Sequence, residues 1–294
     1  MSEISQIVKF LKKNFLNNVN YKKKSSRQSI HLSKNLNFLL KNDYLVERQL
    51  IPVKFLINIR KKFLNNLTPR NIFFPKDTSN LNIKQFKDLY KKNRTLKFWK
   101  NFPKISSSDH KQGIKSWKKK CNYVVFKNPE KICPEIKKIK DIPRIKKITD
   151  FYFDKLKYKH VHSKVIYTFK KKKFPIDVQV FHNDLDGQKV LKLFLYLNNV
   201  KNKSDGPTEF IKRSNIFFNE NSPKLKNWKT RLIHKKQDMK FKYNSIFSFI
   251  GNVGDGFFLN TGVYHKGSMP KNKDRTLLIL TFNCHDELIT GKLN

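Results

Sequence analysis

The spacing of apolar residues along the chain changes about half-way. Up to about residue 158, apolar side chains recur every three or four positions, which is the spacing of an amphipathic helix. This pattern predicts a helix near 7–15, a strand or turn followed by a helix within 38–64, and a further helix within 134–158. From about residue 163, short runs of β-branched and aromatic residues alternate with polar turns. That second pattern predicts strands.

Seven apolar runs in the second half are the predicted strands: VIYTF, PIDVQVFH, VLKLFLYL, TEFI, SIFSFI, GFFLN and RTLLILTF. All glycines except Gly113 follow residue 186, and glycine commonly forms the tight turns between strands. Short strands at such intervals are typical of a sandwich or jelly roll. We therefore predict a mainly β protein with N-terminal helices, an α+β fold whose β part is a jelly roll.

The basic composition is a second feature of the sequence. Lys and Arg number 64 against 22 Asp and Glu, so the formal net charge is +42, which attracts polyanions. Only nine of these residues are Arg, however, and the chain contains no Ala but much Lys, Asn, Ile and Phe. These residues have AT-rich codons, so an AT-biased genome would produce the same charge. We interpret the charge as compositional and expect no specific nucleic-acid partner.

The sequence also indicates where the protein works. No run approaches the ~20 apolar residues that span a bilayer, and the amino-terminal segment lacks the features of a signal peptide. The three cysteines are widely spaced, which is typical neither of a disulfide framework nor of a zinc site. We expect a cytoplasmic protein without a membrane partner.

Candidate chemistry is concentrated in the β-rich half. His182 and Asp184 lie two positions apart, so in an extended chain their side chains point to the same side. A second histidine, His265, ends the segment GFFLNTGVYH, which we expect to continue the predicted strand GFFLN. Two imidazoles and one carboxylate form the facial triad that binds non-haem Fe(II). Arg275 follows ten residues later and could bind a carboxylate through two hydrogen bonds, which predicts a keto acid co-substrate.

The segments that carry these residues resemble a known family. Residues 181–215 and 254–282 are similar to the phytanoyl-CoA dioxygenase-like family of Fe(II)/2-oxoglutarate oxygenases, and 40–63 resembles its opening strand and helix less specifically. The shared features are His-x-Asp, an apolar strand, a Gly-Pro turn, the distal His and an Arg-led strand. Two motifs differ: Lys212–Asn215 replaces the usual Pro-Gly-Ser-His, and Asn260 stands where Asp is common.

The resemblance implies a fold and a set of roles. The fold is a double-stranded β-helix (jelly roll/cupin-like), with His182, Asp184 and His265 as iron ligands and Arg275 as the partner of the distal carboxylate of 2-oxoglutarate. The implied domains are a Lys-rich extension at 1–35, an oxygenase domain at 36–285 with its β-helix core at about 163–283, and a tail at 286–294.

The implied activity is that of a dioxygenase. With Fe(II), 2-oxoglutarate and O₂, it would hydroxylate a C–H bond of a small molecule or an acyl- or sugar-type metabolite and release succinate and CO₂. Lys192 or Tyr196, which share one face of a predicted strand, could help to bind 2-oxoglutarate. Two alternatives are a nucleic-acid demethylase, in which a second Arg is usual at the position of Thr281, and a basic non-catalytic binding protein. We interpret His160 and His162 as surface residues.

Overall fold

The structure is a computed structural model of the chain. It describes residues 35–73, 115, 117, 121–154, 156–170, 177–179, 181–182, 184, 189–211, 217–218, 239–240 and 246–284. The predicted tail lies outside these residues, as does the predicted N-terminal extension apart from its last residue, and so does the motif Lys212–Asn215. None of the helices in the described residues is long and apolar enough to cross a membrane.

The chain is helical over residues 35–42, and strands and short helices alternate after that. In chain order the elements are β1 (Tyr44–Glu47), α3 (Val53–Asn65), η2 (Pro69–Asn71), β2 (Ile72–Phe73), β3 (Tyr123–Phe126), α8 (Pro129–Ile132), η4 (Pro134–Asp141), α9 (Pro143–Phe153), β4 (Lys159–Thr168), η5 (Asp177–Gln179), β5 (Lys189–Tyr196), η6 (Lys203–Asp205), β6 (Thr208–Ile211), β7 (Phe217–Phe218), β8 (Met239–Lys240), β9 (Ile246–Phe249), β10 (Gly256–Leu259), β11 (His265–Gly267) and β12 (Arg275–Cys284).

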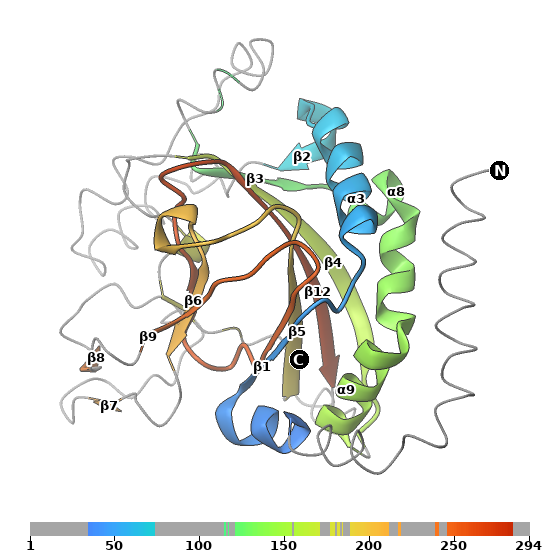
Figure 1. The fold of residues 1–294 in the computed structure, drawn as a ribbon, viewed down its shortest axis with the longest axis vertical. Coiled ribbons are helices and arrows are strands. Elements are labelled where there is room, and N and C mark those ends of the chain that lie inside the picture. Colours follow the sequence, from blue (N-terminus) through green and yellow to red (C-terminus); the bar gives the residue numbers. More distant parts are fainter. Residues whose placement is uncertain are drawn as a thin grey trace, which may run out of the picture.

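Two antiparallel sheets form the centre of the molecule (Figure 1). The larger sheet has seven strands in the order β1-β10-β5-β12-β4-β3-β2, and the smaller has three in the order β11-β6-β9. Their inner faces share an aromatic core, in which Phe257 of the large sheet lies 4.6 Å from Phe249 and 5.5 Å from Phe210 of the small sheet, measured between ring centroids. The arrangement is consistent with the predicted jelly roll.

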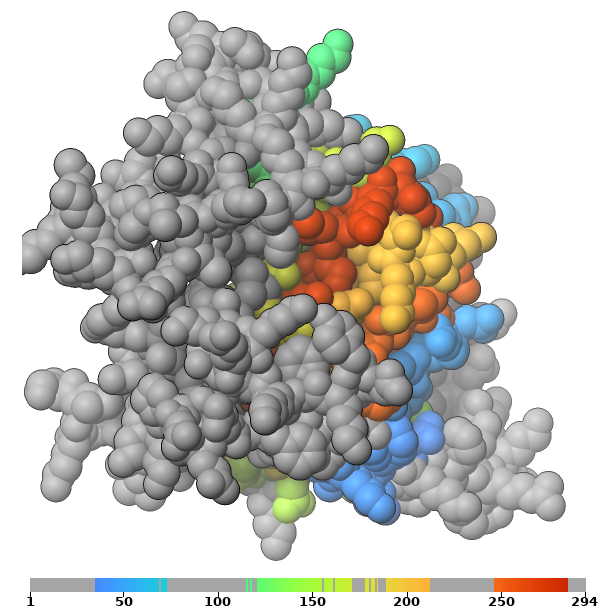
Figure 2. Space-filling view, turned by 90° about the vertical axis from the view of Figure 1, so that its left-hand side faces the viewer, coloured from blue at the N-terminus to red at the C-terminus, as the bar shows by residue number. Residues whose placement is uncertain are grey.

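Segments that are distant in sequence meet in the large sheet. Strand β1 pairs with β10 in an antiparallel register that places Tyr44 opposite Leu259. Figure 2 shows the blue N-terminal segment beside gold and orange segments of the β-rich half. The N-terminal part therefore belongs to the same unit as the β-rich half.

Helices cover the outer face of the large sheet (Figure 1). Strand β12 explains why both faces are buried: Leu278 and Leu280 belong to the core beneath the helices, whereas Leu277 and Ile279 belong to the core between the sheets. Because side chains of a strand alternate between its faces, a strand covered on both sides buries side chains on both faces and is largely apolar. All ten residues of β12 are accordingly buried.

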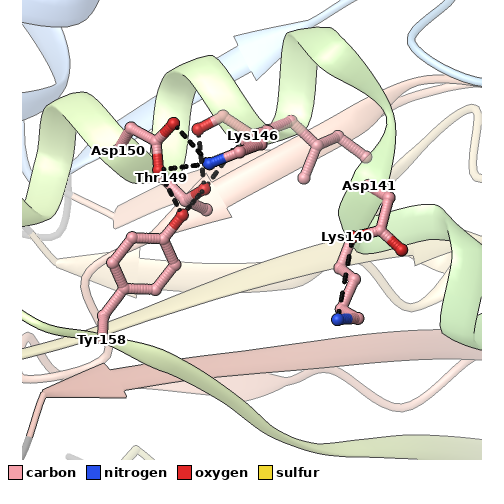
Figure 3. A network of polar contacts seen from close by, with 7 residues as sticks. Lys140, Asp141, Lys146, Thr149, Asp150 and Tyr158 are labelled. Carbon is pink, nitrogen blue, oxygen red and sulfur yellow. Dashed lines mark hydrogen bonds and ion pairs between the residues drawn. The ribbon is translucent and has the colours of Figure 1, made fainter.

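A polar network joins the end of α9 to the segment that leads into β4 (Figure 3). The hydroxyl of Tyr158 donates to Asp150 at 2.6 Å and lies 2.9 Å from the hydroxyl of Thr149. Lys146 pairs with the same Asp150 carboxylate at 2.8 Å, and the Tyr158 ring stacks on Phe153 at 4.6 Å. These contacts fix the helical layer against the sheet.

Most predicted elements are confirmed. The helix within 38–64 is α3, and the helix within 134–158 is divided into η4 and α9; the three-residue apolar spacing suits a 3₁₀ helix. Five of the seven predicted strands match β5, β6, β9, β10 and β12, and VIYTF lies largely in β4.

Two local predictions are wrong. The run PIDVQVFH is not a strand: it contains the 3₁₀ turn η5, and only His182 at its end pairs with a strand. Pro and Asp at the start of this run favour turns, and the Gln179 side chain is held by Asn122 at 2.8 Å. The strand from Gly256 ends at Leu259, so His265 opens a separate strand in the other sheet.

Candidate metal centre

The structure brings His182 and His265 together through their backbones. The amide of His182 donates to the carbonyl of His265 at 2.9 Å, and the reverse bond measures 2.8 Å. This pairing places His182 at the free edge of β11. Asp184 is fixed two residues later, because its amide donates to the carbonyl of Thr261 at 2.8 Å. Residues about eighty positions apart are thus held by main-chain bonds.

The side chains of these three residues converge. Nε2 of His265 lies 3.4 Å from a carboxylate oxygen of Asp184, and Nε2 of His182 lies 4.0 Å from the other oxygen. All three donor atoms lie within 4.8 Å of one another, and both histidines are buried. Nδ1 of His265 lies 3.0 Å from the carbonyl of Val263, which can only accept a hydrogen bond. Nδ1 therefore carries the proton, and in the neutral ring Nε2 offers its lone pair to the cluster.

Lys192 adds a cation to this cluster. Its Nζ lies 2.7 Å from Asp184, and both side chains are almost buried. Burial alone would raise the pKa of the Asp184 carboxyl. The contact with His265 and the nearby charge of Lys192 outweigh that effect and hold this pKa far below its ordinary value. Asp184 is therefore an ionised carboxylate, as metal binding requires.

Arg275 is a buried cation at the start of β12. Its guanidinium donates to the carbonyl of Gly206 and, at 3.3 Å, to the hydroxyl of Thr168, while its Nε is buried without a hydrogen-bond partner. Among the described residues, no carboxylate forms an ion pair with it. Burial lowers the pKa of this guanidinium, although arginine stays charged. A buried guanidinium without a protein carboxylate fits an anionic ligand.

Strand β11 relates this cation to the histidines. A Cβ placed on Gly267 would lie 3.1 Å from Nη2 of Arg275, so the guanidinium occupies the space where a side chain would stand. His265 and Gly267 are two residues apart and face the same side, about 7 Å from each other along the strand. Thr208 lies opposite Gly267 on β6, and its hydroxyl is buried without a hydrogen-bond partner. The cluster, the hydroxyl of Thr208 and the guanidinium of Arg275 therefore lie on one face of the small sheet.

Comparison with known proteins finds similar structures but no similar sequence. No protein-family model matches the sequence, and no curated protein matches it in a sequence comparison. Among solved structures, HygX from Streptomyces hygroscopicus, with nickel and 2-oxoglutarate bound, is similar over 85% of this chain and 86% of that chain, with 11% identity and a TM-score of 0.53. The non-heme alpha ketoglutarate dependent epimerase SnoN from nogalamycin biosynthesis is similar over 86% of this chain and 83% of that chain, with 9% identity and a TM-score of 0.56.

The chain has the fold of these two enzymes. SnoN is also described in complex with Fe³⁺, alpha ketoglutarate and nogalamycin RO, and that structure has a TM-score of 0.53 and 10% identity over 86% of this chain and 84% of that chain. At such low identities, the comparison shows the fold, and the site must be argued from the residues of this chain.

Other residues singled out in the sequence have different positions. Tyr196 is fully buried, where its hydroxyl donates to the carbonyl of Phe249 at 2.9 Å and accepts from the amide of Thr208 at 2.8 Å. Asn260 donates to the side chain of Asp43 at 2.8 Å. Both residues therefore hold segments of the fold together.

The sequence analysis did not single out Thr208, whose position opposite Gly267 depends on the pairing of β6 with β11. His162 is exposed as expected, but its neighbour His160 is half-buried against the ring of Phe282, so the surface interpretation of His160 is wrong. The burial of His160 could have been inferred from β12. Its apolar run predicts a strand covered on both faces, so residues of a neighbouring strand are buried as well.

Proposed function

We propose that this protein is an Fe(II)- and 2-oxoglutarate-dependent oxygenase that oxidises a C–H bond of a small molecule and releases succinate and CO₂. One observation carries the proposal: two histidines and an aspartate converge on one face of a sheet, beside a buried arginine that has no carboxylate partner among the described residues. The shared fold with HygX and SnoN supports it.

The three donor residues fit a metal ion. Two neutral imidazoles and one carboxylate on one side form the donor set of non-haem Fe(II), which leaves the opposite positions open. His182, Asp184 and His265 would hold the ion, and their main-chain bonds prevent the donors from separating. Iron with 2-oxoglutarate and O₂ supplies the oxidising chemistry, and the protein provides binding, orientation and exclusion of water.

The arginine pocket fits the second carboxylate of 2-oxoglutarate. The acid has carboxylates at both ends of a five-carbon chain, and the pocket lies about 7 Å along β11 from His265. Arg275 would bind the distal carboxylate with two parallel hydrogen bonds, and the hydroxyl of Thr208 would donate a third. Both groups are already buried, so the ligand satisfies polar atoms that the protein leaves without partners.

The finer features follow from the same site. We infer the strand arrangement of a double-stranded β-helix, a relationship to the phytanoyl-CoA dioxygenase-like enzymes, hydroxylation as the outcome and a cytoplasmic location. Asp184 supports hydroxylation, because a halogenase site gives up this carboxylate to make room for chloride. The pairing of His182 with β11 supports the β-helix, because it extends the small sheet to four segments opposite the large one.

Anaerobic titration tests the proposal. Fe(II) with 2-oxoglutarate should give the weak visible charge-transfer band of a chelated keto acid in the full chain. Asp184→Ala and His265→Ala should each lose most of this band, because a site with only three protein donors cannot replace one of them. Asp141→Ala removes an exposed carboxylate from the end of η4 and is the matched control. The proposal fails if folded Asp184→Ala and His265→Ala proteins show the band at wild-type strength.

A further inference from the structure

The turn between β10 and β11, at residues 260–263, contacts two of the three candidate metal donors. The carbonyl of Thr261 accepts a hydrogen bond from the amide of Asp184 at 2.8 Å. The carbonyl of Val263 contacts Nδ1 of His265 at 3.0 Å. Thr261 and Val263 are both buried, so the turn cannot shift without disturbing these contacts. The backbone of the turn therefore sets the place of Asp184 and the orientation of the His265 ring.

Asn260 shapes this turn with its side chain and its main chain. The side-chain oxygen of Asn260 accepts from the amide of Gly262 at 3.1 Å. Its main-chain carbonyl accepts from the amide of Val263 at 3.2 Å. Asparagine commonly forms a turn in this way, by hydrogen bonding to the backbone two residues further on. The conformation of the turn thus depends on where the Asn260 side chain is held.

Asp43 holds that side chain from the N-terminal part of the chain. Strand β1 pairs with β10 so that Tyr44 lies opposite Leu259, and Asp43 and Asn260 continue this pairing. The amide of Asn260 donates to the carbonyl of Asp43 at 2.8 Å, and its side-chain nitrogen donates to the Asp43 carboxylate, also at 2.8 Å. Asp43 has a φ of 67°, a left-handed conformation that aspartate adopts more readily than most residues. A double contact therefore joins the N-terminal part to the turn.

We propose that Asp43 and Asn260 are positioning residues for the metal centre, because together they hold the turn that places Asp184 and His265. The inference rests on the proposed function and adds to it two residues that are not metal donors themselves. A carboxylate at position 260 could not donate to Asp43, and the two like charges would repel each other. The side chains would separate, and the turn would move with them.

Anaerobic competition between the full chain and a coloured Fe(II) chelator, without 2-oxoglutarate, tests the inference. Asn260→Asp should weaken Fe(II) binding by roughly 10–100-fold, the range typical for residues that orient metal ligands. The direction is informative, because an added carboxylate would by itself attract the cation and strengthen binding. Urea unfolding of the metal-free protein is measured alongside. A merely structural role would lower the free energy of unfolding and leave the Fe(II) affinity of the folded protein unchanged.

A double-mutant cycle tests whether the two residues act as a pair. In the Asp43→Asn background, the amide at position 43 can donate to a carboxylate at position 260, so donor and acceptor are exchanged. Asn260→Asp should therefore weaken Fe(II) binding by less than about threefold in this background.

Asn71→Asp is the matched control. The side-chain nitrogen of Asn71 donates to the carbonyl of Asn66 at 3.2 Å, beyond the end of α3, so the variant loses a comparable contact in the helical layer. It should leave the Fe(II) affinity unchanged. If Asn260→Asp does not fold, Asn260→Ala keeps the test decisive, because it removes the same contacts without adding a charge. It should weaken Fe(II) binding about tenfold.

The inference is overturned if folded Asn260→Asp or Asn260→Ala protein binds Fe(II) as tightly as the wild type, or if Asn260→Asp has the same effect in both backgrounds. An equal loss in Asn71→Asp would also overturn it. If the wild-type protein binds no Fe(II), or if Asp184→Ala and His265→Ala leave the affinity unchanged, the proposed function itself fails. The two failures are therefore distinguishable.

Discussion

Arg275 is a buried cation whose hydrogen bonds and charge are only partly satisfied by the described residues. Its guanidinium is buried, two of its nitrogens donate to neutral oxygens of Gly206 and Thr168, and Nε has no hydrogen-bond partner. Burying a cation in this way is unfavourable unless an anion joins it. The arrangement is therefore easiest to understand as one half of an ion pair with a ligand.

Substitution of this residue separates co-substrate binding from metal binding. Arg275→Lys keeps the charge but loses the fork of parallel donors, so the KM for 2-oxoglutarate should rise about tenfold or more, with little change in Fe(II) affinity. Steady-state succinate release and anaerobic Fe(II) titration measure the two quantities. Arg70→Lys changes an exposed arginine of η2 and is the control. An unchanged KM with loss of iron would contradict the assigned role.

At this scale, residue type and spacing were informative. His182, Asp184, His265 and Arg275 could be selected because few side chains bind a metal or a carboxylate, and the structure brings all four to one region. Thr208 could not be singled out from spacing, because threonine is common in strands and only its register opposite Gly267 places it near Arg275.

The turn between β5 and β6 is the element that holds the guanidinium of Arg275. Gly206 has a φ of 74°, and its carbonyl accepts a hydrogen bond from Arg275. A Cβ at this position would lie 2.5 Å from the backbone nitrogen of Pro270 and 2.7 Å from the carbonyl oxygen of Ser268. Both neighbours are backbone atoms, so the clash cannot be relieved by rotating a side chain.

Gly206→Ala should therefore destabilise the protein by about 1–3 kcal/mol, through left-handed backbone strain and this close approach. Urea unfolding measures the loss. Lys203→Ala, in the exposed part of the same turn, should change the free energy of unfolding by less than about 0.5 kcal/mol. Equal stability of the two variants would show that the turn has room for a side chain.

Whether a segment is a strand or a turn could be predicted from the sequence where all of its residues are buried. For short segments this prediction was difficult. The apolar run of β12 could be identified because helices and the second sheet cover both of its faces. The strand β11 could not be identified from the sequence, since its conformation depends on pairing with β6. The turn η5 could not be identified either, since it depends on the contact between Gln179 and Asn122. The strand propensity of a residue is a weak predictor where a tertiary contact determines the backbone conformation.

At the scale of the whole molecule, part of the described positive charge lies on the side of the large sheet away from the candidate metal centre. Exposed lysines such as Lys137, Lys138 and Lys147 lie on the helical layer, which covers the outer face of the large sheet. The candidate metal donors lie beyond the inner face, with His182 and His265 paired at the edge of the small sheet. These lysines of the helical layer therefore provide no path that would guide a nucleic acid to the candidate metal donors.

Binding of DNA or RNA should accordingly be weak, independent of sequence and steeply dependent on salt, and it should disappear near physiological ionic strength. Fluorescence anisotropy with two unrelated oligonucleotides at several salt concentrations measures this. A demethylase would instead hold a flipped base at the metal. Methyl loss from an oligonucleotide with stoichiometric succinate, abolished by His182→Ala, would contradict the small-molecule assignment.

Anomalous diffraction at the iron edge, from crystals grown without oxygen in the presence of Fe(II) and 2-oxoglutarate, tests the central claim most directly. We predict one strong peak within bonding distance of Nε2 of His182, Nε2 of His265 and a carboxylate oxygen of Asp184. Density for 2-oxoglutarate should extend from this peak to the guanidinium of Arg275. An iron peak elsewhere, or 2-oxoglutarate bound away from Arg275, would contradict the account.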